Sequence, residues 1–192
     1  MNCNWEDISY LLNGSDKQRK TYDTLGKIEI FEILRKFNPI LVGTIPIDID
    51  IENSDLDIIC EVYDFYEFEE ILSNHFKDIK GFNITLDNRE GTKNIVVSFV
   101  YDQFIIEVFG QPLPTKKQNG YRHMIMEERL LKLGGEDFKR EIIKLKKEGI
   151  KTEPAFTKYL KIGGNPYIEL LKLECLDDEK LLDMIDYNAK KL

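Results

Sequence analysis

Residues 40–60 read ILVGTIPIDIDIENSDLDIIC. Two short apolar runs in this stretch, at 40–43 and 56–60, have the length and composition of buried strands. Because side chains alternate along a strand, Asp55 and Asp57 project from one face while the apolar residues beside them enter the other. The sequence therefore predicts two carboxylates aimed at one point where the second strand begins.

A third acidic residue lies in an equally apolar setting. Glu107 is the one charge in the run FIIEVF at 104–109, which otherwise suits a core strand. Burying a carboxylate without a partner is costly, and two like charges about 4 Å apart repel by about 4 kcal/mol at an effective dielectric of 20. We therefore expect cations at these three acids. Alternatively, Asp55 caps a turn and Glu107 lies on an exposed edge.

The available ligands favour Mg²⁺ or Mn²⁺ over zinc. The chain has only two histidines, His75 and His123, and its three cysteines, Cys3, Cys60 and Cys175, are far apart, which argues against both a zinc site and a disulfide framework. Carboxylate oxygens suit hard divalent ions, and two such ions can bridge a phosphate chain. We expect a metal held mainly by oxygen.

Gly43 and Thr44, at the end of the first strand, add groups that bind phosphate. A glycine lets the backbone come close to a phosphate, and the adjacent hydroxyl and backbone N–H groups can hold it. After Pro46, isoleucines alternate with Asp48 and Asp50. This alternation indicates either a strand or an extended loop with both aspartates in solvent.

The surrounding sequence predicts an α+β fold. Apolar residues at helical spacing predict a helix at 16–37, capped by Asp16, and another at 64–76. Strand-like runs follow at 82–86, 95–101 and 104–109, the first two separated by a turn-rich stretch at 87–94. We expect an α+β fold in which a mixed β-sheet is flanked by helices and followed by a C-terminal helical region.

The texture changes at 111–120, QPLPTKKQNG, which is typical of a connector. The rest predicts helices at 121–133, 136–148, 155–160 and 167–173, and a last one from about 178. We expect an α+β domain at 1–114 and a helical region packed on it at 115–192. A solvated helix face is predicted for the basic residues Lys139, Arg140, Lys144, Lys146 and Lys147.

Composition bounds the function. With 42% hydrophobic and 32% charged residues, the 192-residue chain is globular rather than disordered. No apolar run approaches the roughly 18 residues of a membrane span, and the first residues lack a secretion signal, so we expect a cytoplasmic protein without a membrane partner.

A net charge of −8 disfavours a long nucleic-acid partner. The acidic excess lies in residues 1–114 and a mild basic excess in 115–192, either to place positive charge near a phosphorylated ligand or by chance.

Three segments, LVGT at 41–44, SDLDI at 54–58 and IIEVF at 105–109, resemble the signature of the DNA polymerase β-like nucleotidyltransferase superfamily. That signature is a strand ending in Gly and Ser or Gly, an Asp-x-Asp strand about a dozen residues later, and a third acid on a neighbouring strand. This resemblance covers residues 16–110. The strings GTIPIDID, SDLDIICE, QNGYRHM and KTEPAF are similar to an uncharacterised bacterial family within the superfamily, over nearly the whole chain.

The resemblance implies roles for named residues. The implied catalytic and metal-binding residues are Asp55, Asp57 and Glu107, of which the aspartates would bind both ions and Glu107 would complete one site and help activate the acceptor. The implied nucleotide-binding residues are Gly43, Thr44 and Ser54. One departure is that Pro46 and the following isoleucines replace the short helix that usually follows the glycine pair.

The expected function is transfer of a nucleoside monophosphate from a nucleoside triphosphate such as ATP to an unknown small-molecule or protein acceptor, by a two-metal displacement. Secondary candidates for substrate contacts are Gln118, Arg122 and His123, although such a histidine is more often a buried helix residue bonded to a carbonyl. Two alternatives stay open. One is a catalytically inactive module that binds a nucleotide or a partner, and the other is a toxin or antitoxin component acting on protein or tRNA.

Overall fold

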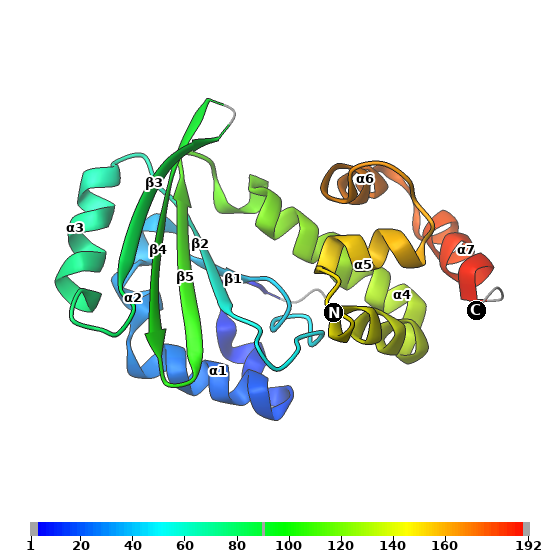
Figure 1. Cartoon of the computed structure of the whole chain (residues 1–192), viewed down its shortest axis with the longest axis horizontal. Coiled ribbons are helices and arrows are strands. Elements are labelled where there is room, and N and C mark those ends of the chain that lie inside the picture. Colours follow the sequence, from blue (N-terminus) through cyan, green and yellow to red (C-terminus); the bar gives the residue numbers. More distant parts are fainter. Residues whose placement is uncertain (1–3, 90, 190–192) are drawn as a thin grey trace. The chain divides into compact units, whose positions relative to one another are not determined.

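The structure, a computed structural model, describes residues 4–89 and 91–189 (Figure 1). Two compact units make up the chain. Unit 1 comprises Met1–Asp48 and Ser54–Tyr121, and unit 2 comprises Ile49–Asn53 and Arg122–Leu192. The division into domains at 1–114 and 115–192, which the sequence leads us to expect, remains a prediction.

Unit 1 is built on a five-stranded mixed sheet with the order β1-β2-β5-β4-β3. Its strands are β1 (Ile40–Val42), β2 (Leu56–Glu61), β3 (Asn83–Arg89), β4 (Thr92–Tyr101) and β5 (Phe104–Gln111). β2 and β5 pair in parallel, and the other neighbours pair antiparallel. The predicted α+β fold is therefore confirmed. The predicted turn at 87–94 is wrong for most of its length, because β3 and β4 continue their pairing as far as Arg89 and Thr92.

The helices of unit 1 precede, interrupt and follow the strands. They are the 3₁₀ turns η1 (Ile8–Asn13), η2 (Arg35–Phe37) and η3 (Thr115–Lys117) and the α-helices α1 (Asp16–Lys27), α2 (Ile30–Ile33) and α3 (Phe65–Phe76). The prediction of one helix at 16–37 is wrong, because Glu29 has a left-handed backbone (φ 50°) that ends the first helix. The cap is Ser15, which forms a capping box with Gln18, rather than Asp16.

The two faces of the sheet have different roles. On one face, buried residues such as Ile58 and Val108 form a single core with residues of α1, α2 and α3, among them Leu25 and Phe68. Residues of opposite parity, including Asp57 and Glu107, project from the other face. The core therefore holds one face of the sheet against α1, α2 and α3. The acidic side chains project from the opposite face.

Unit 2 is helical within the described residues. α4 (Asn119–Lys147) begins in unit 1, and its non-helical Gly135 (φ 67°, ψ −166°) divides it where the sequence predicts two helices. The others are α5 (Thr152–Tyr159), α6 (Pro166–Lys172), the 3₁₀ turn η4 (Leu173–Cys175) and α7 (Asp178–Ala189). Phe138 packs edge-on against Phe156 and Tyr159 in its core. In the described part of the chain, no helix has both the length and the apolar character required to cross a bilayer.

The cysteines are not paired where the structure describes them. Cys60 is a buried free thiol on β2, and burial raises its pKa. Cys175 is an exposed free thiol, and Cys3 lies outside the described residues. The two described thiols agree with the expectation of reduced cysteines.

Candidate functional site

The structure brings Asp55, Asp57 and Glu107 together. Asp57 on β2 and Glu107 on β5 are direct partners in the parallel register, and Asp55 precedes β2 by one residue on the same face. One carboxylate oxygen from each of the three lies within 4.8 Å of the other two. Asp55 is exposed, whereas Asp57 and Glu107 are half-buried. The three acids thus form one cluster from two strands that are distant in sequence.

The cluster is rich in negative charge that the surrounding protein does not fully compensate. Within residues 4–89 and 91–189, the carboxylates of Asp55 and Glu107 have no hydrogen bond or ion pair to another side chain. Like charges at this separation repel one another. The arrangement is therefore suited to a cation supplied from solution, and its three hard oxygen donors suit Mg²⁺ or Mn²⁺.

Gly43 lies directly beside this cluster. It follows Val42, the partner of Asp57 in the antiparallel pairing of β1 and β2, and it has a left-handed backbone (φ 84°). A Cβ atom at this position would lie 2.8 Å from Oδ2 of Asp57. Only glycine therefore combines this turn with so close an approach to the carboxylate.

Residues 43–55, here named the connecting loop, link β1 to β2. The expectation of a strand or an extended loop is wrong, because residues 44–48 form consecutive turns and Asp48 is left-handed (φ 55°). Asp48 and Asp50 are half-buried rather than fully in solvent. At the ends of the loop, the Thr44 hydroxyl donates to the Ser54 hydroxyl at 3.3 Å. The predicted nucleotide-binding residues Gly43, Thr44 and Ser54 are therefore near one another.

One flank of the acidic face is closed by the start of α4. A Cβ atom at Gly120 would lie 3.6 Å from the side chains of both Val42 and Ile59, so the helix backbone passes close to the sheet there. Ile59 belongs to the same face of β2 as Asp57. The acidic cluster thus has a packed apolar border on the side where α4 begins.

The secondary candidates have partners in the fold. Gln118 is buried, and its amide donates to the carbonyls of Cys60 and Leu113, both at 2.9 Å. Arg122 forms a two-bond ion pair with Glu174 in unit 2.

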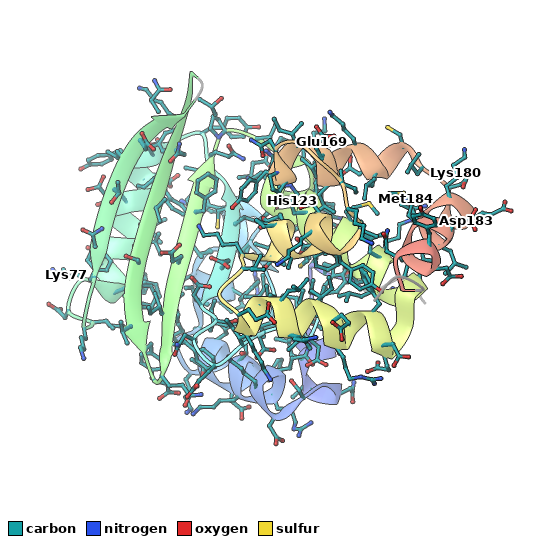
Figure 2. The ribbon with its side chains drawn as sticks, turned by 45° about the vertical axis from the view of Figure 1, so that its right-hand side comes forward. Lys77, His123, Glu169, Lys180, Asp183 and Met184 are labelled. Atoms are coloured by element: carbon teal, nitrogen blue, oxygen red, sulfur yellow. The ribbon has the colours of Figure 1, made fainter. Side chains whose placement is uncertain are left out.

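His123 also lies among the helices of unit 2 (Figure 2). Its Nε2–H donates to the Tyr167 carbonyl at 2.8 Å, and its Nδ1 lies 3.6 Å from Oε1 of Glu153. The contact of Gln118, Arg122 and His123 with a substrate stays a prediction.

Sequence reasoning missed two side chains that hold the connecting loop. Gln18 on α1 donates to the carbonyls of Ile45 and Pro46, and Lys146 on α4 donates to the carbonyl of Ile49. The prediction that Lys146 belongs to a solvated face is wrong, because only 5% of this residue is exposed. A lysine in a basic stretch and a glutamine in a first helical turn gave no signal of these long-range bonds.

Comparison with known proteins places these features in context. The family model described as Domain of unknown function (DUF4269) matches residues 23–173. No curated protein matches the chain in sequence. A solved structure of a cytoplasmic RNA terminal U-transferase is similar with a TM-score of 0.50 and 15% identity, over 81% of this chain and 47% of that one.

Two structures of the Cid1 poly(U) polymerase are similar to the same degree. The structure bound to Mg 3′-dATP has a TM-score of 0.50 and 13% identity, over 85% of this chain and 52% of that one. The complex with the UTP analog UMPNPP has a TM-score of 0.50 and 14% identity, over 85% and 51%. The chain thus shares the fold of these transferases and spans about half of their length.

Proposed function

Because the chain belongs to the DUF4269 family, a domain of unknown function, we propose its activity from its own acidic cluster and its fold. The proposed activity is metal-dependent nucleotidyl transfer of the DNA polymerase β-like kind. A nucleoside monophosphate moves from a nucleoside triphosphate to an acceptor, and pyrophosphate is released. The observation that carries the proposal is the convergence of Asp55, Asp57 and Glu107, with one oxygen from each within 4.8 Å of the others.

The donor set fits Mg²⁺ or Mn²⁺. Oxygens bound to one Mg²⁺ at about 2.0–2.1 Å lie up to about 4 Å apart, so the spacing of at most 4.8 Å requires only a small rotation of the side chains. The cluster contains no His or Cys, the ligands that zinc prefers. The fold supports the same ligand, since the similar Cid1 structure contains Mg 3′-dATP.

In the proposed reaction, each residue has a separate task. Asp55 and Asp57 hold the cations, and Thr44, Ser54 and the Gly43 turn hold the terminal phosphates. An acceptor oxygen forms a bond to the α-phosphorus while the bond from that phosphorus to pyrophosphate breaks, and Glu107 assists removal of the acceptor proton. When bound, the divalent ions supply electrostatic stabilisation of the charge that develops on the phosphate oxygens.

We propose a small molecule or a protein side chain as the acceptor. The net charge of −8 and the pI near 5.0 do not indicate the basic footprint that a long nucleic acid requires. The similar transferases act on RNA, but this chain spans about half of their length. Retention of all three acids favours an enzyme over an inactive binding module.

The test is metal-dependent nucleotide binding by wild type and Asp57→Asn. Isothermal titration with each Mg²⁺-nucleoside triphosphate is expected to show binding by wild type that Asp57→Asn weakens by at least about tenfold. Even the loss of a residue that only hydrogen-bonds to a metal ligand commonly lowers metal affinity by about that factor. The matched control is Asp78→Asn, which removes one exposed aspartate just beyond α3.

Three results would overturn the proposal. One is equal nucleotide affinity of wild type and Asp57→Asn. Another is nucleotide binding that is the same with Mg²⁺ and with a chelator. A loss of affinity in Asp78→Asn as large as in Asp57→Asn would show a general charge effect and would also contradict the assignment.

A further inference from the structure

The connecting loop is held by two buried side-chain donors from different helices. Gln18 of α1 is 6% exposed, and its Nε2 donates to the carbonyls of Ile45 at 2.8 Å and Pro46 at 3.1 Å. Lys146 of α4 is 5% exposed, and its Nζ donates to the carbonyl of Ile49 at 2.7 Å. Three carbonyls within five residues of loop are thus bound by side chains that lie far away in the sequence.

These donors act on different parts of the loop. Residues up to Asp48 belong to unit 1 together with Gln18, whereas Ile49–Asn53 belong to unit 2 together with Lys146. The chain returns to unit 1 at Ser54, immediately before the acidic cluster. Gln18 therefore anchors the first half of the loop in unit 1, and Lys146 anchors its middle in unit 2.

Anchoring a carbonyl also sets the direction of the next amide. Because the peptide unit is planar and trans, a fixed carbonyl of Pro46 or Ile49 fixes the orientation of the N–H that follows it. The loop contains turns but no helix or strand, so no regular hydrogen-bond pattern orders it. Its isoleucines contribute apolar anchoring, since Ile45 and Ile49 are buried. Apolar contacts do not orient peptide groups, whereas the bonds from Gln18 and Lys146 do.

Burial of Lys146 is costly in itself. A buried ammonium group requires partners that replace water. Besides the Ile49 carbonyl, Lys146 interacts electrostatically with the buried carboxyl of Glu127. Burial raises the pKa of Glu127 to about 8, repulsion from Glu153 adds to the rise, and Lys146 opposes it. The buried ammonium group of Lys146 thus links the polar interior of unit 2 to the Ile49 carbonyl of the connecting loop.

We propose that Gln18 and Lys146 are positioning residues of the nucleotide site. They hold the connecting loop in the conformation in which Gly43, Thr44 and Ser54 bind the terminal phosphates, in place of a helix that would order the backbone. This inference rests on the proposed function, because it assigns a task to the loop of that site. Neither residue is proposed to touch the nucleotide.

The experiment separates nucleotide affinity from metal affinity in Gln18→Met and Lys146→Met. Isothermal titration measures the Kd of the tightest Mg²⁺-nucleoside triphosphate, and Mn²⁺ titration followed by electron paramagnetic resonance measures metal binding without nucleotide. Each variant is expected to raise the nucleotide Kd by about tenfold, as supporting residues commonly do, and to leave the Mn²⁺ Kd within about twofold of wild type.

Matched controls account for lost stability. Ser15→Ala breaks the capping box that Gln18 shares without removing the bonds from Gln18 to the loop. Asn188→Leu removes a buried amide of unit 2 that donates to the carbonyls of Leu160 and Met184. Both controls are expected to lower Tm and to keep the wild-type nucleotide Kd.

The outcomes distinguish the two proposals. Wild type without nucleotide affinity overturns the proposed function and this inference together. Wild-type affinity that is unchanged in Gln18→Met and Lys146→Met, or lost equally in the controls, overturns this inference alone. Should Lys146→Met not fold, Gln18→Met decides, because Gln18 lies in unit 1 and is not among the groups that shift the pKa of Glu127.

Discussion

Gly43 shows how a single residue sets the geometry of the acidic cluster. Its left-handed backbone turns the chain out of β1, and its missing side chain leaves room for the carboxylate of Asp57. The Gly43 turn and Asp57, the proposed metal ligand, therefore lie too close together for a side chain at position 43. Any side chain at position 43 must displace either the loop or Asp57.

We expect Gly43→Ala to weaken metal binding and to lower stability. The methyl group would meet Oδ2 of Asp57 at 2.8 Å, and the positive φ adds a cost of about 1–2 kcal/mol for a residue with a Cβ. Urea unfolding and Mn²⁺ titration measure the two effects. Gly26→Ala is the control, because a Cβ at that helical position has no neighbour within 4 Å. Unchanged Mn²⁺ affinity in Gly43→Ala would contradict this account.

At the same scale, part of the cluster was predictable from sequence. The alternation of a strand places Asp55 and Asp57 on one face, and a lone acid in FIIEVF marks Glu107. Gln18 and Lys146 were not predictable, because their bonds to the loop depend on how distant helices pack and leave no local pattern. Local periodicity shows on which face of a strand or helix a residue lies. The distant group to which its side chain binds is decided by tertiary packing.

Among the elements, α4 brings charged groups into the interior of unit 2. Glu127 lies before the break at Gly135 and Lys146 lies after it, and both are buried. The break at Gly135 thus allows the two segments of α4 to contribute to one polar cluster. That cluster makes the stability of the protein dependent on pH.

We expect stability to fall as the pH rises from about 4.5 to about 8 because of Glu127. The pKa of this carboxyl is about 8 in the folded protein against 4.5 as its ordinary value, so the folded state binds the proton more tightly. Its contribution is fully present below pH 4.5 and is lost as the pH approaches 8, with a size on the order of 5 kcal/mol. Urea midpoints of wild type and Glu127→Gln across this range measure the effect.

Glu127→Gln is expected to flatten the pH profile and to be more stable than wild type at pH 8. Glu136→Gln, at an exposed position of α4, serves as the control and is expected to keep the wild-type slope. Parallel profiles for wild type and Glu127→Gln would show that the carboxyl does not titrate as described.

Prediction of the elements succeeded where local signals agree with packing. The strands β1, β2 and β5 and the capped helix α3 combine apolar periodicity with clear boundaries, as in Asp64 at the start of α3. The helix at 16–37 failed because apolar spacing continues through Glu29, where the backbone turns left-handed. The turn at 87–94 failed because polar residues at the end of a hairpin still pair across strands.

On the scale of the whole molecule, the proposed metal binding is coupled to folding. The cluster combines residues from two strands, so the unfolded chain does not contain it. A ligand whose free concentration is about a hundred times its Kd stabilises the folded state by about 2.7 kcal/mol. For a chain of this length that corresponds to a rise in Tm of about 5–10 °C.

We expect Mn²⁺ to raise the Tm of wild type by this amount and to leave that of Glu107→Gln nearly unchanged. Differential scanning calorimetry also reveals whether the two units unfold together. If they unfold separately, the rise is confined to the transition of unit 1, which contains all three acids. The control is Glu70→Gln, an exposed glutamate on α3. An equal rise in Glu107→Gln would exclude this residue as a ligand.

The parallel pairing of β2 with β5 has a consequence for the order in which the protein folds. The segment between these strands, with α3, β3 and β4, must be complete before Glu107 reaches Asp57. Closing so long a segment is among the slower events of folding, because the entropy of the chain is lost before the contacts form. The acidic cluster is thus completed late in assembly. Under the proposed function, a half-finished chain would have no competent centre with which to consume nucleotides.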